Sequence, residues 1–333
     1  AAGILGVLIR GQASVVGDKY VFTDRQVNAI LELRLYQLTA MEQDKIKAKP
    51  SLGDTALPER VRIATVQFQM RKINSIDEFE QQIEYFTDIA SDYKSDFVVF
   101  PELFTLQLLS LEHRPLGPVE SIEKISEYTP RFIEFMEKLA VSYNINIIGG
   151  SMIEADEDGY LYNIAYLFRR DGTQERQAKL HITPQERRDW IIEGGNELAV
   201  FDTDAGRIGM QVCYDVEFPE LSRLLADDDM DILFVPFWTD TKNGYLRVRH
   251  CAQARAIENE CYVVLCGSVG NLPSIENLDI QYAQSAVFSP SDFAFPHDAV
   301  LNETTPNTEM IFFSDLDFNK LKLVRSEGSV TNL

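Results

Sequence analysis

Two hydrophobic patterns alternate in the chain between residues 60 and 150. Three segments rich in apolar and β-branched residues are too short for helices and have the composition of strands. They span residues 61–69, 96–100 and 144–150. The segments between them place apolar side chains at helical spacing, and each begins with a helix-start signal, a Ser75–Glu78 capping box or a Thr129–Pro130 pair. This alternation predicts a sheet with helices packed outside it.

The pattern changes between residues 160 and 212 and then returns. Short apolar runs in this region are separated by turn-forming pairs, as in hairpins. These pairs are Asp158–Gly159, Asp171–Gly172 and Ala205–Gly206. Two further buried runs follow, at 231–238 and 261–267, with a predicted helix over 245–259 between them. We therefore expect an α/β domain whose sheet is antiparallel in part.

The first 50 residues differ from the rest in charge. They carry seven Lys and Arg against five Asp and Glu, whereas the totals of 31 and 52 leave 24 against 47 for the remainder. Turn-forming residues 49–54 separate the two parts. A Thr23–Gln26 capping box precedes apolar residues at helical spacing. We expect a helical N-terminal extension over residues 1–55 and a second domain over residues 60–333.

The predicted helix of the extension resembles a known protein segment. Residues 23–46 are similar to a helical segment of the DNA-breaking A subunit of bacterial type IIA topoisomerases, in the pattern Q-x-x-AIL-x-x-RL-x-x-LT-x-x-E-x-x-KI. The match includes neither a catalytic tyrosine nor a DNA-binding core, so no function is carried over. An isolated helix of this length is marginal in water unless its apolar face is buried. We expect it to pack on its own body or on a second subunit.

Composition narrows the function classes. The chain of 333 residues is 45% hydrophobic and carries a formal net charge of -21, which repels nucleic acid and anionic membrane surfaces. No apolar run approaches the roughly 18 residues of a membrane span, and the apolar start before Arg10 lacks the basic region of a signal peptide. Four irregularly spaced cysteines fit neither a disulfide framework nor a zinc site. We expect a cytoplasmic protein without a metal.

Three reactive side chains follow apolar runs, where α/β folds collect functional groups. Glu102 follows residues 96–100, Lys179 ends the hairpin region, and Cys213 follows residues 208–212. Singly, each has an ordinary structural interpretation as a loop acid, a surface charge or a small core residue. Together they form an acyl-transfer set without histidine. A buried carboxylate accepts the thiol proton, and a lysine offsets its charge and stabilises an oxyanion.

The same three segments resemble the motifs of the nitrilase superfamily of carbon–nitrogen hydrolases. They read 101-PELF-104, 178-AKLHITPQERRDW-190 and 212-VCYDVEFPE-220. Residues 253–264 and 328–333 fit the same family, so the resemblance spans about residues 60–333. It implies an α/β fold, a four-layer α-β-β-α sandwich, that usually pairs into dimers. A homodimer or a higher homo-oligomer is therefore expected.

The resemblance also implies roles for individual residues. Cys213 corresponds to the nucleophile, Glu102 to the general base and Lys179 to the residue that stabilises the tetrahedral intermediate. Glu186 corresponds to a second glutamate that orients the site. The backbone N–H of Tyr214 would supply another oxyanion donor at a strand-to-helix turn. Water activated by Glu102 would then release the acid from a thioester, with no cofactor.

The residues after the nucleophile bear on the substrate. The order Cys213-Tyr214-Asp215 resembles amidase branches, whereas true nitrilases commonly show Cys-Trp-Glu. A small-molecule amide is therefore expected as substrate, with water as co-substrate. Glu217 stands where omega-amidase-like proteins often carry arginine, which favours a neutral or amine-bearing substrate over a dicarboxylic monoamide.

Other interpretations stay open. A nitrilase or an N-carbamoyl hydrolase would use the same triad, and a non-catalytic scaffold of this fold would bind a protein through its N-terminal helix. Related proteins with an acyltransferase domain ahead of the hydrolase are a further case. Fewer than 60 residues precede the predicted hydrolase domain, so acyl-CoA chemistry is not expected.

Overall fold

The computed structural model describes residues 14–16, 19–21, 58–273, 275 and 278–332. The chain divides into two compact units, Ala1–Pro50 and Ser51–Leu333. The described residues of the first unit form an antiparallel pair of strands, β1 (Ser14–Val16) and β2 (Lys19–Val21). The helix expected within residues 23–46 lies outside the described residues. The domain limits of 1–55 and 60–333 therefore stay a prediction.

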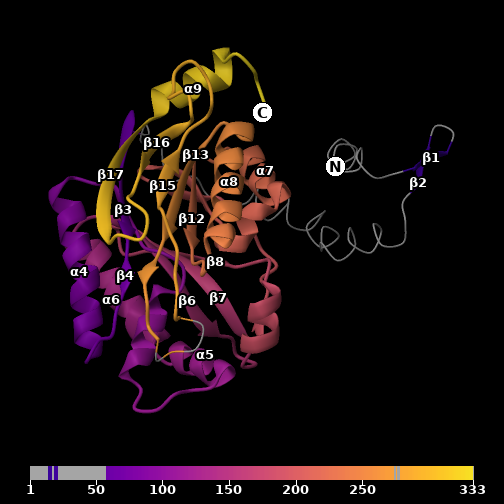
Figure 1. Ribbon diagram of the computed structural model, residues 1–333. Coiled ribbons are helices and arrows are strands. Elements are labelled where there is room, and N and C mark those ends of the chain that lie inside the picture. The colour runs from indigo at the N-terminus through magenta and orange to yellow at the C-terminus, as the bar shows by residue number, and fades with distance from the viewer. Residues whose placement is uncertain (1–13, 17–18, 22–57, 274, 276–277, 333) are drawn as a thin grey trace. The chain divides into compact units, whose positions relative to one another are not determined.

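The second unit contains a seven-stranded mixed sheet (Figure 1). Its strand order is β17-β3-β5-β6-β7-β8, with β9 paired to β7. The strands are β3 (Arg60–Gln67), β5 (Phe97–Val99), β6 (Asn146–Ala155), β7 (Leu161–Phe168), β8 (Gln174–Ala178), β9 (Ile192–Glu193) and β17 (Met310–Asp317). The central strands β3, β5 and β6 are parallel, whereas β7 and β8 form the hairpin that the turn signals predict.

A six-stranded mixed sheet faces the first. Its order is β10-β11-β12-β13-β15-β16, and β11, β12 and β13 are parallel. The strands are β10 (Phe201–Thr203), β11 (Gly206–Met210), β12 (Ile232–Phe237), β13 (Tyr262–Gly267), β15 (Ala286–Phe288) and β16 (Val300–Glu303). A short parallel pair, β4 (Gln69–Met70) and β14 (Val269–Gly270), lies outside both sheets.

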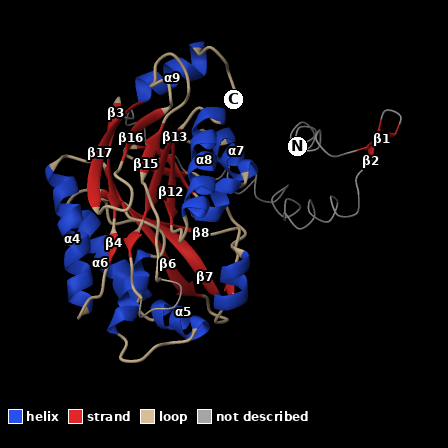
Figure 2. Ribbon diagram, in the orientation of Figure 1, coloured by secondary structure: helices blue, strands red, loops and turns tan. Residues whose placement is uncertain are grey.

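Helices cover the outer faces of the two sheets (Figures 1 and 2). The α-helices are α4 (Ile76–Asp92), α5 (Pro118–Ser126), α6 (Thr129–Ser142), α7 (Pro219–Asp227), α8 (Lys242–Glu258) and α9 (Phe318–Glu327). Helices α4 and α6 pack on the seven-stranded sheet, and α8 packs on the six-stranded sheet. These layers confirm the predicted four-layer sandwich.

The hydrophobic pattern explains why the layers assemble. Ser75 caps α4 by accepting a hydrogen bond from the Glu78 N–H, and Phe79, Ile83 and other apolar residues of this helix are buried against the sheet. Between the sheets, the rings of Phe97 and Phe234 lie 5.2 Å apart in a continuous apolar core. Burial of both faces accounts for the unbroken apolar runs of the central strands.

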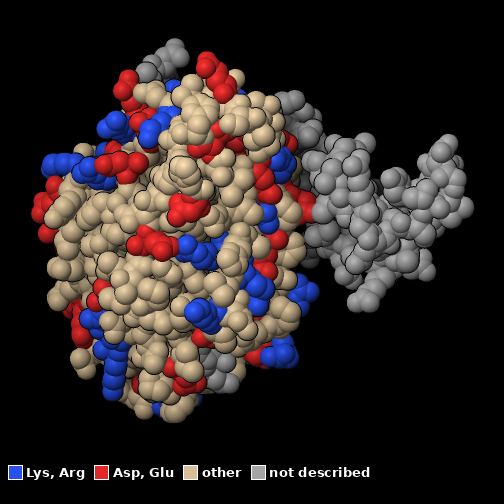
Figure 3. All heavy atoms as spheres, turned by 45° about the horizontal axis from the view of Figure 1, so that its top comes forward, with Lys and Arg blue, Asp and Glu red and all other residues tan. Residues whose placement is uncertain are grey.

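Acidic and basic side chains are interspersed over the face shown in Figure 3. Among the described helices, none combines the length and the apolar composition that crossing a membrane requires.

Candidate active site

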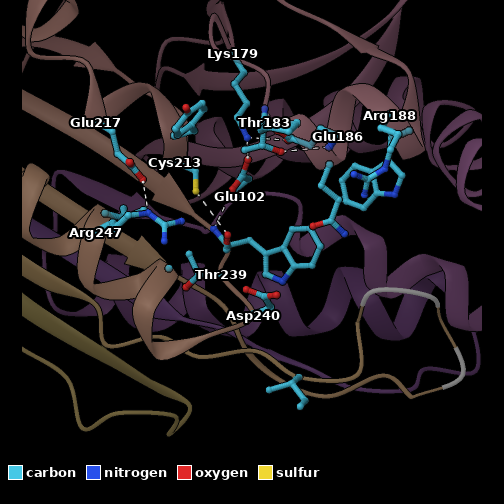
Figure 4. A pocket seen from close by; sticks show the side chains of 18 of the residues that line it. Glu102, Lys179, Thr183, Glu186, Arg188, Cys213, Glu217, Thr239, Asp240 and Arg247 are labelled. Atoms are coloured by element: carbon cyan, nitrogen blue, oxygen red, sulfur yellow. Dashed lines mark hydrogen bonds and ion pairs between the residues drawn. The ribbon is translucent and has the colours of Figure 1, made fainter.

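The three predicted reactive residues meet beside one cavity of about 600 Å³ (Figure 4). Glu102 follows the end of β5 and Lys179 follows the end of β8, both in the seven-stranded sheet. Cys213 follows β11 of the six-stranded sheet, so the cavity combines side chains from both sheets. The structure thus brings together residues that are up to 111 positions apart, since 213 minus 102 is 111.

Lys179 lies between two carboxylates. Its Nζ is 2.8 Å from Oε1 of Glu102 and 2.7 Å from Oε1 of Glu186, and the side chain is 1% exposed. Burial alone would lower the pKa of Lys179, but the negative charges of Glu102 and Glu186 outweigh it and hold this pKa well above its ordinary value. The lysine is therefore a fixed positive charge inside the site.

Glu102 is a buried carboxyl group, and each of its two oxygens accepts a hydrogen bond. Its Oε1 also accepts a hydrogen bond from Asn163 Nδ2 at 2.9 Å, and its Oε2 accepts one from the Trp238 N–H at 2.9 Å. Burial raises the pKa of Glu102, and the charge of Lys179 only partly opposes that rise. A raised pKa makes the carboxylate a stronger base, as a general base requires.

Cys213 begins a short 3₁₀ helix, Cys213–Glu217, with a backbone φ of 47°. This left-handed conformation is uncommon for a residue with a β-carbon and persists only where the surroundings enforce it. The thiol donates to the Trp238 carbonyl oxygen at 3.5 Å and also lies close enough to Glu102 to affect that carboxyl's pKa. Burial, followed by the charge of Glu102, raises the pKa of Cys213. The thiol is therefore held protonated next to a base.

The backbone N–H of Tyr214 is the expected second oxyanion donor, and this role requires that it be unpaired. No described residue accepts a hydrogen bond from the Tyr214 N–H, which lies in the first turn of the 3₁₀ helix. The first-turn amide of a helix carries partial positive charge and is suited to an oxyanion. The role of this amide stays a prediction.

Glu186 lies in a single π-helical turn, Glu186–Trp190. Its Oε2 accepts a hydrogen bond from the Thr183 N–H at 2.9 Å, while its own N–H donates to the Thr183 hydroxyl at 3.2 Å. This reciprocal pair fixes the carboxylate that contacts Lys179. The orienting role expected for Glu186 is consistent with this geometry and stays a prediction.

The wall of the cavity carries charges of both signs. Glu217 faces the cavity, and its Oε1 lies 3.6 Å from Nε of Arg247 (Figure 4). Arg188, on another part of the wall, pairs with Asp189 at 2.7 Å. Because Arg247 offsets the charge of Glu217, the substrate preference expected from Glu217 alone stays a prediction. The described residues contain no cluster of His, Cys, Asp and Glu arranged to hold a metal ion.

The sequence patterns assigned no role in the site to three further residues. Asn163 and Trp238 contact Glu102 as described above, and the Asn163 carbonyl oxygen also accepts from the Lys179 N–H at 2.8 Å. The third is Asp215, whose contacts are given below. Asn163 lies inside β7 and carried no local signal. Trp238 directly follows a buried strand, and that position is the one signal that could have found it.

Comparison with known proteins identifies the family of the chain. The carbon–nitrogen hydrolase family profile matches residues 62–325. A probable hydrolase, YhcX of Bacillus subtilis, is 55% identical over 274 residues, which are 82% of this chain and 53% of that protein. The chain thus spans about half the length of this relative. The omega-amidase NIT3 of Saccharomyces cerevisiae is 26% identical over 245 residues, which are 70% of this chain and 81% of that protein.

Solved structures agree with the sequence relatives. The structure of Saccharomyces cerevisiae Nit3, a member of the nitrilase superfamily, superposes with a TM-score of 0.68 at 25% identity, covering 81% of this chain and 94% of that one. An amidase from Nesterenkonia superposes with a TM-score of 0.64 at 20% identity over 83% of this chain and 98% of that chain, which shows a shared fold. The chain therefore belongs to the carbon–nitrogen hydrolase family of the nitrilase superfamily.

Proposed function

We propose that the protein is a small-molecule amidase that works through a Cys213 thioester. The observation that carries this proposal is the placement of the Lys179 ammonium between Glu102 and Glu186 in the cavity that holds Cys213. Burial of three ionisable groups side by side has a desolvation cost that lowers the stability of the fold, and such clusters are typical of catalytic sites. The cost argues against a non-catalytic scaffold.

In the first half of the reaction, Cys213 attacks the amide carbon. The thiol proton passes to the Glu102 carboxylate as the bond between sulfur and carbon forms. The carbonyl oxygen becomes an oxyanion, which the Lys179 ammonium and the Tyr214 N–H stabilise. When this intermediate collapses, the carbon–nitrogen bond breaks, Glu102 returns its proton to the nitrogen, and ammonia or an amine leaves.

In the second half, water replaces the leaving group. Glu102 takes a proton from water, and the resulting hydroxide attacks the thioester carbon. Collapse of the second tetrahedral intermediate breaks the bond between carbon and sulfur, and the thiolate takes the proton back from Glu102. The products are a carboxylic acid and the free enzyme, so atoms and protons balance with water as the only co-substrate.

The relatives support amides over the alternatives with the same triad. The yeast relative is named an omega-amidase, and a relative from Synechocystis, 30% identical over 61% of this chain, is named a deaminated glutathione amidase. Both names describe amide cleavage. Nitrile or N-carbamoyl hydrolysis is the second candidate, because Glu102, Lys179 and Cys213 would serve it equally well.

A product assay distinguishes these candidates. Purified protein is incubated with matched series of short aliphatic amides, nitriles and N-carbamoyl compounds, and ammonia release is measured. We expect release from amides at least about tenfold faster than from the matched nitriles, with none from Cys213→Ala. Faster turnover of nitriles or carbamoyl compounds would overturn the amide assignment. No Cys213-dependent turnover in any series would contradict the proposed function.

The assembly and the compartment are also part of the proposal. We infer a homodimer or a higher homo-oligomer, as the family resemblance implies, and a reducing cytoplasmic setting. All four cysteines are free thiols, which supports a reducing compartment. Light scattering of the purified chain tests the first inference, and a monomeric mass at micromolar concentration would contradict it.

A further inference from the structure

Asp215 joins the two chain segments that carry the proposed lysine and the proposed nucleophile. Its Oδ1 accepts hydrogen bonds from the His181 N–H at 2.7 Å and the Leu180 N–H at 3.2 Å. Its Oδ2 accepts from the Leu180 N–H at 3.1 Å and the Val212 N–H at 3.4 Å. Leu180 directly follows Lys179, and Val212 directly precedes Cys213. One carboxylate therefore spans both segments.

The burial and the partners of the Asp215 carboxylate indicate a structural role. Asp215 is 2% exposed, and its one side-chain partner among the described residues is the Nδ1 of His181, at 3.1 Å. A buried carboxylate is costly unless its oxygens are hydrogen-bonded, and here backbone amides supply most of the donors. The ring of His181 is itself held by stacking on Phe218, with ring centroids 3.6 Å apart.

The same residue also closes the turn around the nucleophile. The Asp215 N–H donates to the Val212 carbonyl oxygen at 3.0 Å, while the Val212 N–H donates to the Asp215 side chain. Cys213 lies inside this loop with its positive φ. A strained conformation needs surroundings that fix it, and the Asp215 contacts provide two of the fixed points.

We propose that Asp215 is a positioning residue, which holds the Lys179 backbone in register with Cys213 so that the ammonium meets the developing oxyanion. The inference rests on the proposed function, because it concerns the alignment of that reaction. An Asn side chain has the same shape but offers one acceptor oxygen, and its amide group would oppose the backbone N–H donors. Asp215→Asn should therefore misalign the two segments while leaving most of the fold in place.

Asp231 supplies a matched control. It lies ahead of β12, at the opposite end of this strand from Trp238, and its carboxylate likewise accepts from a backbone N–H, that of Arg207, at 3.2 Å. It also accepts from Arg325 Nη1 at 3.2 Å. Asp231→Asn removes a comparable structural carboxylate without touching the site. Urea unfolding gives the folded fraction of each variant, and each measured rate is divided by that fraction.

The test compares kcat and KM for the best amide substrate. We expect Asp215→Asn to lower kcat on the order of a hundredfold with KM within about threefold of the wild type, and Asp231→Asn to leave kcat within about twofold. A kcat loss below about threefold in Asp215→Asn, or an equal loss in the two variants, overturns the inference.

A second measurement keeps the inference testable if no amide is turned over. The rate of Cys213 alkylation by iodoacetamide near pH 8 depends on the thiolate, which the Lys179 charge favours. Misalignment of Lys179 slows alkylation in Asp215→Asn. Loss of the Asp215 charge alone would speed it, because a nearby negative charge disfavours the thiolate. Without turnover, slower alkylation supports the inference, and an equal or faster rate overturns it.

Discussion

Gly150 lies against Pro101 so closely that a β-carbon on Gly150 would stand 2.9 Å from the Pro101 carbonyl carbon and closer still to its oxygen. Gly150 also has a φ of 61°, and the register between β6 and β7 shifts at this point. Glu102 directly follows Pro101. The bulged glycine therefore supports the turn that directs the proposed base into the cavity.

Gly150→Ala should consequently impair both stability and turnover. Overlap with the Pro101 backbone and the positive φ predict a loss of about 1–3 kcal/mol in the free energy of unfolding. Displacement of Glu102 should lower kcat at least about tenfold. Gly159→Ala is the matched control, because Gly159 has a φ of 84° with nothing within 4 Å of its added β-carbon. Similar kcat losses in the two variants, measured with urea unfolding, would contradict this account.

Glu102→Gln should abolish proton transfer while keeping the shape of the site. Gln has one acceptor oxygen, so it can accept the Asn163 or the Trp238 hydrogen bond but not both, and it cannot take the thiol proton. We therefore expect a kcat loss on the order of a hundredfold or more. Circular dichroism should report a folded protein. Glu157→Gln, an exposed position in the turn between β6 and β7, is the control. Normal turnover by Glu102→Gln would require a different base.

Cys261 should make stability depend on pH in the alkaline range. Burial raises the pKa of its thiol from 9.0 to about 12. Between these values the unfolded chain loses a proton that the folded chain keeps, so the unfolded state is favoured as pH rises. The free energy of unfolding should fall by about 1.4 kcal/mol per pH unit from this thiol within that window.

Urea unfolding of the wild type and Cys261→Ala at pH 8 and pH 10 measures this effect. The variant lacks the titrating group, so its stability should decline less between the two pH values, by about 1.4 kcal/mol. Parallel declines of the two proteins would show that the Cys261 thiol does not titrate as its burial predicts.

A chain of residues 56–333 should keep amide turnover. Glu102, Lys179, Glu186 and Cys213 all lie in the unit Ser51–Leu333, and their described contacts are made within it. We expect kcat within about twofold of the full chain, together with any change in stability or mass that loss of the extension causes. A folded but inactive truncated chain would show that residues 1–55 contribute to the site.

The sequence predicts the central strands well, because a strand buried on both faces is an unbroken apolar run. The strand β5 and the position of Glu102 after it follow from such a run, as does the position of Cys213 after β11. The reactive residues that follow the strands were also visible in the sequence, since Lys179 and Glu186 lie in a motif that resembles a known family. Those assignments depend on local patterns.

The contacts that fix the site were not visible in the sequence. Asn163 reaches Glu102 across 61 positions, and the Trp238 N–H reaches it across 136. Asp215 meets His181 across 34 positions. Such hydrogen bonds form only after distant strands pair, so periodicity carries no signal for them. The left-handed φ of Cys213 is likewise imposed by tertiary contacts, since local preference opposes it.

If Cys213 forms an acyl thioester, intact-protein mass spectrometry of the enzyme quenched in acid during amide turnover should detect it. We expect a mass increase equal to the acyl group, located on the peptide that contains Cys213 and absent from Cys213→Ala. Hydroxylamine should remove the added mass. Ammonia release at an undiminished rate by Cys213→Ala, or an acyl group on any other residue, would show that Cys213 is not the nucleophile.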